Sequence, residues 1–136
     1  MSAEELVAAS HLFDSPATTE WAQRFLNAHG HHLLMAWVGE EAAGFVSGVE
    51  TTHPDKGTEM FLYELSVDEG ARRRGIGARL VQELAELARE RGCYGMWTGT
   101  EADNVAARRT YARAGATLVP VHAFVEWSFR RVGTGG

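Results

Sequence analysis

The feature that most constrains the fold is a strand–loop–helix–strand unit in the middle of the chain. Residues 60–67 (MFLYELSV) are mostly apolar and predict a buried strand. Residues 76–91 repeat their apolar side chains on one face at helical spacing, and Gly92 follows as a terminating residue. Residues 94–99 predict the next strand. A crossover of this length predicts two parallel strands of one sheet, joined by a right-handed connection.

The N-terminal half predicts two helices followed by two strands. A helical turn is expected over residues 3–10, and Ser15-Pro16 predicts the start of a second helix that Gly30 stops. Residues 33–38 and 43–51 are rich in apolar side chains and predict strands. The two helices are therefore expected to precede the sheet in the chain.

Beyond the central unit, a helix is expected over residues 104–114, with Asp103 or Asn104 as its N-cap. Residues 117–119 and 123–130 predict two closing strands. This order of elements predicts an α+β domain with a mixed sheet.

The composition predicts one globular domain over residues 1–136, with a flexible tail over residues 133–136. Apolar residues make up 45% of the chain, and no stretch approaches the roughly 18 consecutive apolar residues of a membrane-spanning helix. The single cysteine, Cys93, has no partner for an internal disulfide and lacks the neighbours of a metal site. We therefore expect a cytoplasmic protein with no metal and no membrane segment.

Charge is distributed unevenly along the chain. The net charge of −5 argues against general nucleic-acid binding. Residues 1–64 contain ten acidic and two basic residues, whereas residues 65–136 contain eleven arginines and eight acidic residues. The basic half suits a polyanionic cofactor and the acidic half a cationic substrate. Solvated surface charge is the alternative explanation for each single residue.

The loop Arg72–Ala78 (RRRGIGA) combines three arginines with two glycines directly before the predicted helix. Glycines let a backbone approach a ligand closely, and the free N–H groups of a helix N-terminus attract anions. The loop therefore predicts a pyrophosphate site, with an ordinary glycine-containing turn as the alternative. A nucleotide-binding module is disfavoured, because no Gly-Lys-Ser/Thr tripeptide occurs and Leu80 stands where a dinucleotide fingerprint needs a small residue.

Two motifs resemble those of the GNAT acetyltransferases. Arg72-x-x-Gly75-x-Gly77 is similar to the family's Q/R-x-x-G-x-G/A loop. Asn104-x-x-Ala107-x-x-x-Tyr111-x-x-x-Gly115 is similar to its second block, although Thr110 stands where the family has an apolar residue. The resemblance covers roughly residues 33–130.

The resemblance implies a central mixed sheet flanked by helices on both faces, acetyl-CoA as co-substrate, and a fold that allows a homodimer. It implies that main-chain groups of the strand before the loop hold the pantetheine, that loop amides hold the phosphates, and that the second block contacts the pantetheine arm and the thioester sulfur. The strand residues that would hold the pantetheine are Leu65, Ser66 and Val67. The residues of the phosphate-binding loop are Arg72, Arg73, Arg74, Gly75, Ile76, Gly77 and Ala78. In the second block, Asn104 would contact the pantetheine arm and Tyr111 the thioester sulfur.

A narrower resemblance concerns the strand itself. Tyr63-Glu64-Leu65-Ser66-Val67 looks like the Tyr-Asp-Leu-x-Val strand of the aminoglycoside 3-N-acetyltransferases. It implies a small cationic acceptor such as an aminoglycoside. Other acceptors remain open, namely a protein or peptide amine or a polyamine, as does an acyl-CoA-binding domain without catalysis.

Acetyl transfer to an amine needs a base for the ammonium and an acid for the leaving thiolate. Glu64 is the first candidate for the base, and substrate binding alone is its alternative role. Tyr111 is the candidate acid, and a core aromatic is the alternative. A main-chain N–H of the strand, such as that of Leu65, would stabilise the oxyanion. Further acidic residues that could line the acceptor pocket are Glu101, Asp103 and Glu126.

Overall fold

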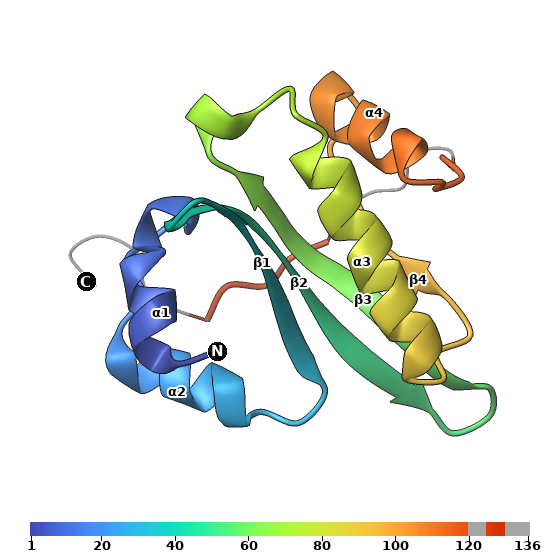
Figure 1. Ribbon diagram of the computed structural model, residues 1–136. Helices are drawn as coiled ribbons and strands as arrows, with labels where there is room; N and C mark the ends of the chain where they lie inside the picture. Colours follow the sequence, from blue (N-terminus) through green and yellow to red (C-terminus); the bar gives the residue numbers. More distant parts are fainter. Residues whose placement is uncertain (120–124, 130–136) are drawn as a thin grey trace.

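A computed structural model describes residues 1–119 and 125–129 (Figure 1). Helices and strands follow one another along the chain as α1 (Ala3–Ala8), η1 (Ser10–Leu12), α2 (Thr19–Asn27), β1 (His31–Val38), β2 (Glu41–His53), β3 (Gly57–Val67), η2 (Glu69–Ala71), α3 (Ile76–Glu90), β4 (Met96–Trp97) and α4 (Val105–Arg113). The order agrees with the prediction for the first helices, the first three strands and the central crossover.

The described strands form one four-stranded sheet in the order β1-β2-β3-β4. β1, β2 and β3 are antiparallel neighbours, and β4 runs parallel to β3 after the crossover through α3. The predicted mixed sheet is therefore confirmed. None of the helices among residues 1–119 and 125–129 is long and apolar enough to cross a membrane.

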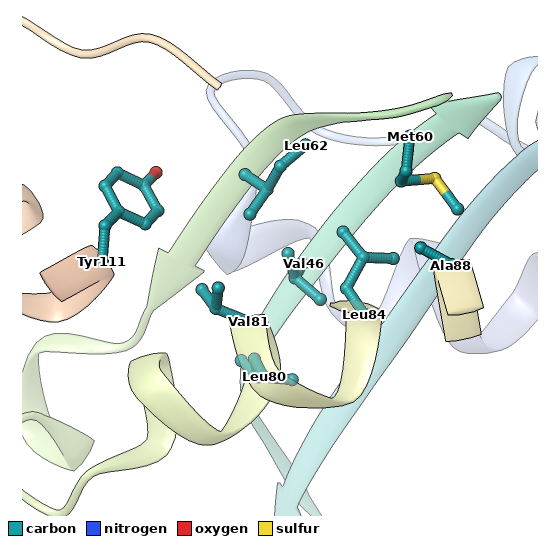
Figure 2. Packing of buried hydrophobic residues seen from close by; sticks show 8 residues of the cluster. All are labelled: Val46, Met60, Leu62, Leu80, Val81, Leu84, Ala88 and Tyr111. Carbon is teal, nitrogen blue, oxygen red and sulfur yellow. The ribbon is translucent and has the colours of Figure 1, made fainter. Parts of the chain in front are cut away.

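The two faces of the sheet carry separate cores because side chains alternate along each strand. Phe45 faces α1 and η1, where it packs with Ala9 and Leu12. Its neighbour Val46 faces the other way and packs with Leu84 of α3. Figure 2 shows this second core, in which side chains of β2 and β3 point toward α3 and Tyr111 lies at one end. Helices thus cover both faces of the sheet, as predicted.

A one-residue irregularity interrupts β3 close to its end. Ser47 is opposite Glu64, whereas the next residue of β2, Gly48, is opposite Leu62, so Tyr63 is an extra residue in β3. Such a bulge reverses which side chains face which layer. Leu62 packs toward α3 before the bulge, and Leu65 packs toward α3 after it. Glu64 is therefore directed to the opposite layer, which contains α1 and α2.

Two predicted boundaries were wrong. The second helix does not begin at Ser15-Pro16, because the hydroxyl of Thr18 accepts a hydrogen bond of 3.2 Å from the Trp21 amide and caps the helix there. It also ends at Asn27, before Gly30.

The predicted closing strands are not formed in the described part of the chain. Residues 117–119 and 125–129 belong to no strand, and residues 120–124 and 130 lie outside the described residues. Leu118 and Val119 are 47% and 69% exposed, so these apolar side chains are not packed on a sheet. An apolar pattern predicts a strand only where a neighbouring strand can pair with it.

Candidate active site

β2 pairs with one edge of β3. The other edge of β3 pairs with β4 at one end and is open at its other end. Among the described residues, β4 pairs with β3 at Met60 and Phe61. Beyond that point the hydroxyl of Thr98 still donates to the Leu62 carbonyl over 2.8 Å, and no described strand continues the pairing. Among the described residues, strand pairing on this edge therefore ends before residues 63–67.

Main-chain groups of Leu65 and Val67 lie on this open edge. The Asp68 amide donates to the Ala43 carbonyl over 2.8 Å, which places residue 68 on the side of β2. Main-chain groups alternate in direction along a strand, so those of residues 65 and 67 point the other way. Arg72 Nε donates to the Val67 carbonyl over 3.3 Å from the open side. Ser66, by the same alternation, directs its main-chain groups toward β2.

The arginine-rich loop reaches α3 through an unusual backbone conformation. Arg73 and Gly75 both have positive φ, of 67° and 76°, and Gly75 is the N-cap of α3 without any side-chain cap. Left-handed residues within such a loop turn successive N–H groups toward one side, which forms an anion-binding concavity. All three arginines are exposed, and Ile76, Gly77 and Ala78 carry the first amides of the helix. The loop can therefore present both N–H groups and cations to an anion.

Gly77 lies where the first turn of α3 meets α4. A Cβ built at this position would be 3.2 Å from the Thr110 methyl and 3.6 Å from a Val67 methyl. Thr110, the departure from the family pattern, uses its hydroxyl within its own helix and donates 2.9 Å to the Ala106 carbonyl. Its methyl group is what packs over Gly77, so threonine serves here as an apolar residue.

α4 brings Tyr111 to the edge of the core. Tyr111 is 8% exposed and packs with residues of β3 and α3 (Figure 2). Burial raises the pKa of its hydroxyl, and a hydrogen bond with Thr98 offsets part of that rise. The phenol therefore keeps its proton at neutral pH and can donate it. Asn104 is the N-cap of α4, and its Oδ1 accepts 3.0 Å from the Ala107 amide, which leaves its amide NH₂ group to contact a ligand.

Glu64 is half-buried on the opposite layer of the sheet. Burial raises the pKa of its carboxyl group, and the negative charge of Asp14 raises it further. A carboxyl group whose pKa lies nearer to neutral is a better proton acceptor at working pH than an ordinary glutamate. The bulge at Tyr63 is what directs this carboxyl group away from the α3 core.

A hollow of about 180 Å³ lies beside Glu64, between the sheet and helices α1 and α2. Its walls are mostly apolar and include Phe13, Phe25 and Phe45, while Ser47 and Glu64 add a hydroxyl and a carboxyl group. Glu64, the candidate base, therefore lies next to an apolar surface.

The remaining predicted acidic residues lie elsewhere. Glu101 and Asp103 are exposed on the connection between β4 and α4, and Glu126 is exposed in a segment without regular structure. None of the three lines the hollow beside Glu64. A wider groove of about 590 Å³ lies between β1 and α3 and includes Arg74 and Gly75. Its floor is β1, which β2 separates from the open edge of β3.

Three contributors to the site were not predicted. Thr98 connects Tyr111 to the end of the β3–β4 pairing, Asp14 affects the pKa of Glu64, and Ser47 stands opposite Glu64. Thr98 follows the last paired residue of β4, so a hydroxyl at a strand end was the available signal. Asp14 and Ser47 carry no such signal, because only the folded chain brings them to Glu64.

A model of the acetyltransferase (GNAT) family matches residues 2–116. The chain belongs to this family, which confirms the resemblance carried by the two motifs. The match includes both blocks, from the loop Arg72–Ala78 to the helix that carries Tyr111. It also supports the prediction of an N-acetyltransferase enzyme.

Individual relatives differ in their acceptors. A mycothiol acetyltransferase from Beutenbergia cavernae is 39% identical over 70 residues, which cover 52% of this chain and 23% of that protein. The chain therefore spans about a quarter of the length of this curated relative. An aminoglycoside acetyltransferase from an uncultured soil metagenomic sample has the same fold, with a TM-score of 0.85 over 96% of this chain and 93% of that chain at 17% identity. An aminoglycoside N-acetyltransferase solved in complex with CoA has a TM-score of 0.71 over 80% of this chain and 84% of that chain at 18% identity.

Proposed function

We propose that the chain transfers an acetyl group from acetyl-CoA to a primary amine of a small cationic acceptor. The observation that carries this proposal is the open edge of β3, which ends at the loop Arg72–Ala78. An extended pantetheine arm could pair with the main-chain groups of Leu65 and Val67 as a further strand would. The pyrophosphate would then reach the N-terminus of α3.

Residues of the loop and of α4 complete the proposed cofactor site. Amides of residues 73–78 would hold the phosphates, and the arginines at 72, 73 and 74 would supply positive charge. Asn104 would contact the pantetheine arm through its amide NH₂ group. The side chains of Leu65 and Val67 pack near Gly77, which fixes the strand against the loop. The main-chain groups of Ser66 point toward β2 and its side chain lies on the face of the sheet that Glu64 occupies, so Leu65 and Val67 are the strand residues proposed to hold the pantetheine arm.

The proposed reaction is direct attack of the amine on the thioester. Glu64 accepts one proton from the acceptor's ammonium group, and the amine nitrogen then bonds to the carbonyl carbon and loses its second proton to solvent as the amide forms. The Leu65 amide donates to the oxyanion that forms. When the carbon–sulfur bond breaks, Tyr111 gives its proton to the thiolate of CoA, and solvent restores the phenol. Cys93 is not needed as a nucleophile, because burial raises the pKa of its thiol.

Two acceptor classes are supported by different observations. An aminoglycoside is supported by the fold of the solved aminoglycoside acetyltransferase and by the acidic character of residues 1–64. A peptide or amino-acid amine is supported by the apolar hollow next to Glu64. A cytoplasmic location suits both classes and the free thiol of Cys93.

Release of free CoA thiol from acetyl-CoA tests the proposal directly. Initial rates are measured with gentamicin, spermidine, leucinamide and glycinamide, each at low and high salt. Acetylation of at least one amine, confirmed by the mass of its product, is the expected result. An aminoglycoside that binds through several carboxylates should lose rate as salt rises. Acetyl-CoA that binds without turnover on any amine would instead support a non-catalytic acyl-CoA-binding domain.

A further inference from the structure

The hollow beside Glu64 has a chemical character that the charge of the whole chain does not suggest. It is formed by side chains of α1, α2, the segment between η1 and α2, and the first three strands, and aromatic rings make up much of its wall. The rings of Phe13 and Phe45 pack at a tilt of 54° with their centroids 4.7 Å apart, which holds two of these rings in place. A volume of about 180 Å³ suits one compact apolar group, because a cavity of roughly 150 Å³ is enough for a benzene ring.

The charged groups at the hollow are few. Glu64 contributes a carboxyl group to the wall of the hollow. The exposed carboxylate of Asp14 is close enough to raise the pKa of Glu64. One ammonium group would satisfy Glu64. Further ammonium groups of a polycation would meet aromatic walls, where cation–π contact would replace only part of the hydration that each group loses. The local surface therefore favours an acceptor with a single positive charge near its reactive end.

We propose that this hollow is the acceptor subsite and that it selects primary amines carrying a compact apolar group close to the nitrogen. The inference rests on the proposed acetyl transfer and narrows its acceptor. In this arrangement Glu64 receives the ammonium group and the apolar substituent enters the hollow toward Phe45. The nitrogen then lies next to Leu65, the residue whose main-chain groups face the open edge of β3.

Leucinamide and glycinamide are the matched probes, since they have the same charge and differ only in an isobutyl group. Leucinamide should exceed glycinamide in kcat/KM by about tenfold or more, because discrimination by one apolar group in a pocket is of this size. It should also exceed spermidine and gentamicin. Equal kcat/KM for leucinamide and glycinamide would overturn the inference.

Ala17→Leu tests whether the hollow causes the preference. Ala17 is half-buried on its wall, and its amide donates to Ser10 Oγ over 3.0 Å, a bond that the substitution keeps. The added side chain should fill the hollow and lower kcat/KM for leucinamide by about tenfold relative to that for glycinamide, which removes most of the preference. Ala8→Leu, at an exposed position of α1 outside the hollow, is the control and should keep the preference. A preference that survives Ala17→Leu would contradict the assignment.

Calorimetry separates this inference from the proposed function. Leucinamide should bind the wild-type protein without acetyl-CoA and bind Ala17→Leu at least about tenfold more weakly. If no amine is acetylated, the proposed function fails, and this binding comparison alone decides the subsite. Absence of leucinamide binding to the wild-type protein in that case would overturn the subsite as well.

Discussion

The proposed cofactor side and the proposed acceptor side of this protein are built in different ways. The cofactor side takes its residues from continuous stretches, namely the end of β3, the loop Arg72–Ala78 and the first turns of α3 and α4. The acceptor side collects single residues from many elements, from Leu6 of α1 to Glu64 of β3. Backbone geometry defines the first side, whereas side-chain packing defines the second. The cofactor side is therefore expected to respond to changes at glycines and caps, and the acceptor side to changes in side-chain volume and charge.

Gly77→Glu should have the largest effect on the cofactor side. Its carboxylate would add a negative charge to the first turn of α3, beside the proposed phosphate site, and its Cβ would be 3.2 Å from the Thr110 methyl. Acetyl-CoA should raise the melting temperature of the wild-type protein by mass action and should leave that of the variant unchanged. Thermal melts with and without acetyl-CoA measure both.

Two controls separate charge from crowding in that experiment. Gly77→Ala adds the Cβ without the charge and should keep part of the shift. Gln82→Glu adds the same charge at an exposed position of α3 and should keep all of it. If acetyl-CoA raises the melting temperature of Gly77→Glu as much as that of the wild-type protein, the loop is not part of the cofactor site.

Tyr111→Phe should lower kcat by about 100-fold while leaving acetyl-CoA affinity nearly intact. The ring stays in the core, and only the hydroxyl that hydrogen bonds with Thr98 is lost. Steady-state rates measure kcat, and a titration with acetyl-CoA measures the affinity for the cofactor. Tyr94→Phe, which loses a bond to Glu59 far along β3, is the matched control and should keep its activity. Full activity of Tyr111→Phe would reduce this residue to a core aromatic.

Glu64→Gln tests the acceptor side and should lower kcat at neutral pH by about tenfold. The amide keeps the shape of the side chain but accepts no proton. Raising the pH should restore part of the rate, since the fraction of free amine grows. A rise in KM with unchanged kcat would instead identify Glu64 as a binding residue only.

Asp14→Asn should have the smallest effect, a shift in the pH profile. The negative charge of Asp14 disfavours the Glu64 carboxylate and so raises its pKa. Removing that charge lowers the pKa, so Glu64 stays deprotonated to lower pH and the acid limb of kcat/KM moves downward. Asp55→Asn, in the turn between β2 and β3, should leave the limb in place. If the acid limb of kcat/KM lies at the same pH in Asp14→Asn, that limb does not report the ionisation of Glu64.

The same contrast explains what the sequence could predict. The central crossover depends on spacing along a continuous chain and agrees with the structure, and the two motif blocks, which also depend on spacing, correctly predicted the family. The bulge at Tyr63 could not be predicted, because the sequence of this strand does not differ in any visible way from that of a strand without a bulge. Without the bulge, the side of the sheet that Glu64 faces cannot be assigned. The hollow depends on how α2 packs on the sheet, and the helix boundary itself was misplaced.

The charge pattern was informative only at the scale of the whole chain. Residues 1–64 are strongly acidic, yet the surface next to Glu64 is mainly apolar. Most of the acidic side chains in that half are exposed away from the hollow or paired elsewhere, as in the Arg91–Glu50 contact of 2.8 Å. Net charge describes steering over long distances, while contacts at the site determine which acceptor fits.

The most direct test of the account is a titration of ¹⁵N-labelled protein with acetyl-CoA, followed by the backbone amide signals. The open edge of β3 and the N-terminus of α3 predict the largest shifts at Leu65, at Val67 and through residues 73–78. The amide of Ser66 should move less, because it faces β2. Large shifts confined to β1 and the outer side of α3, around the wider groove, would contradict the central claim.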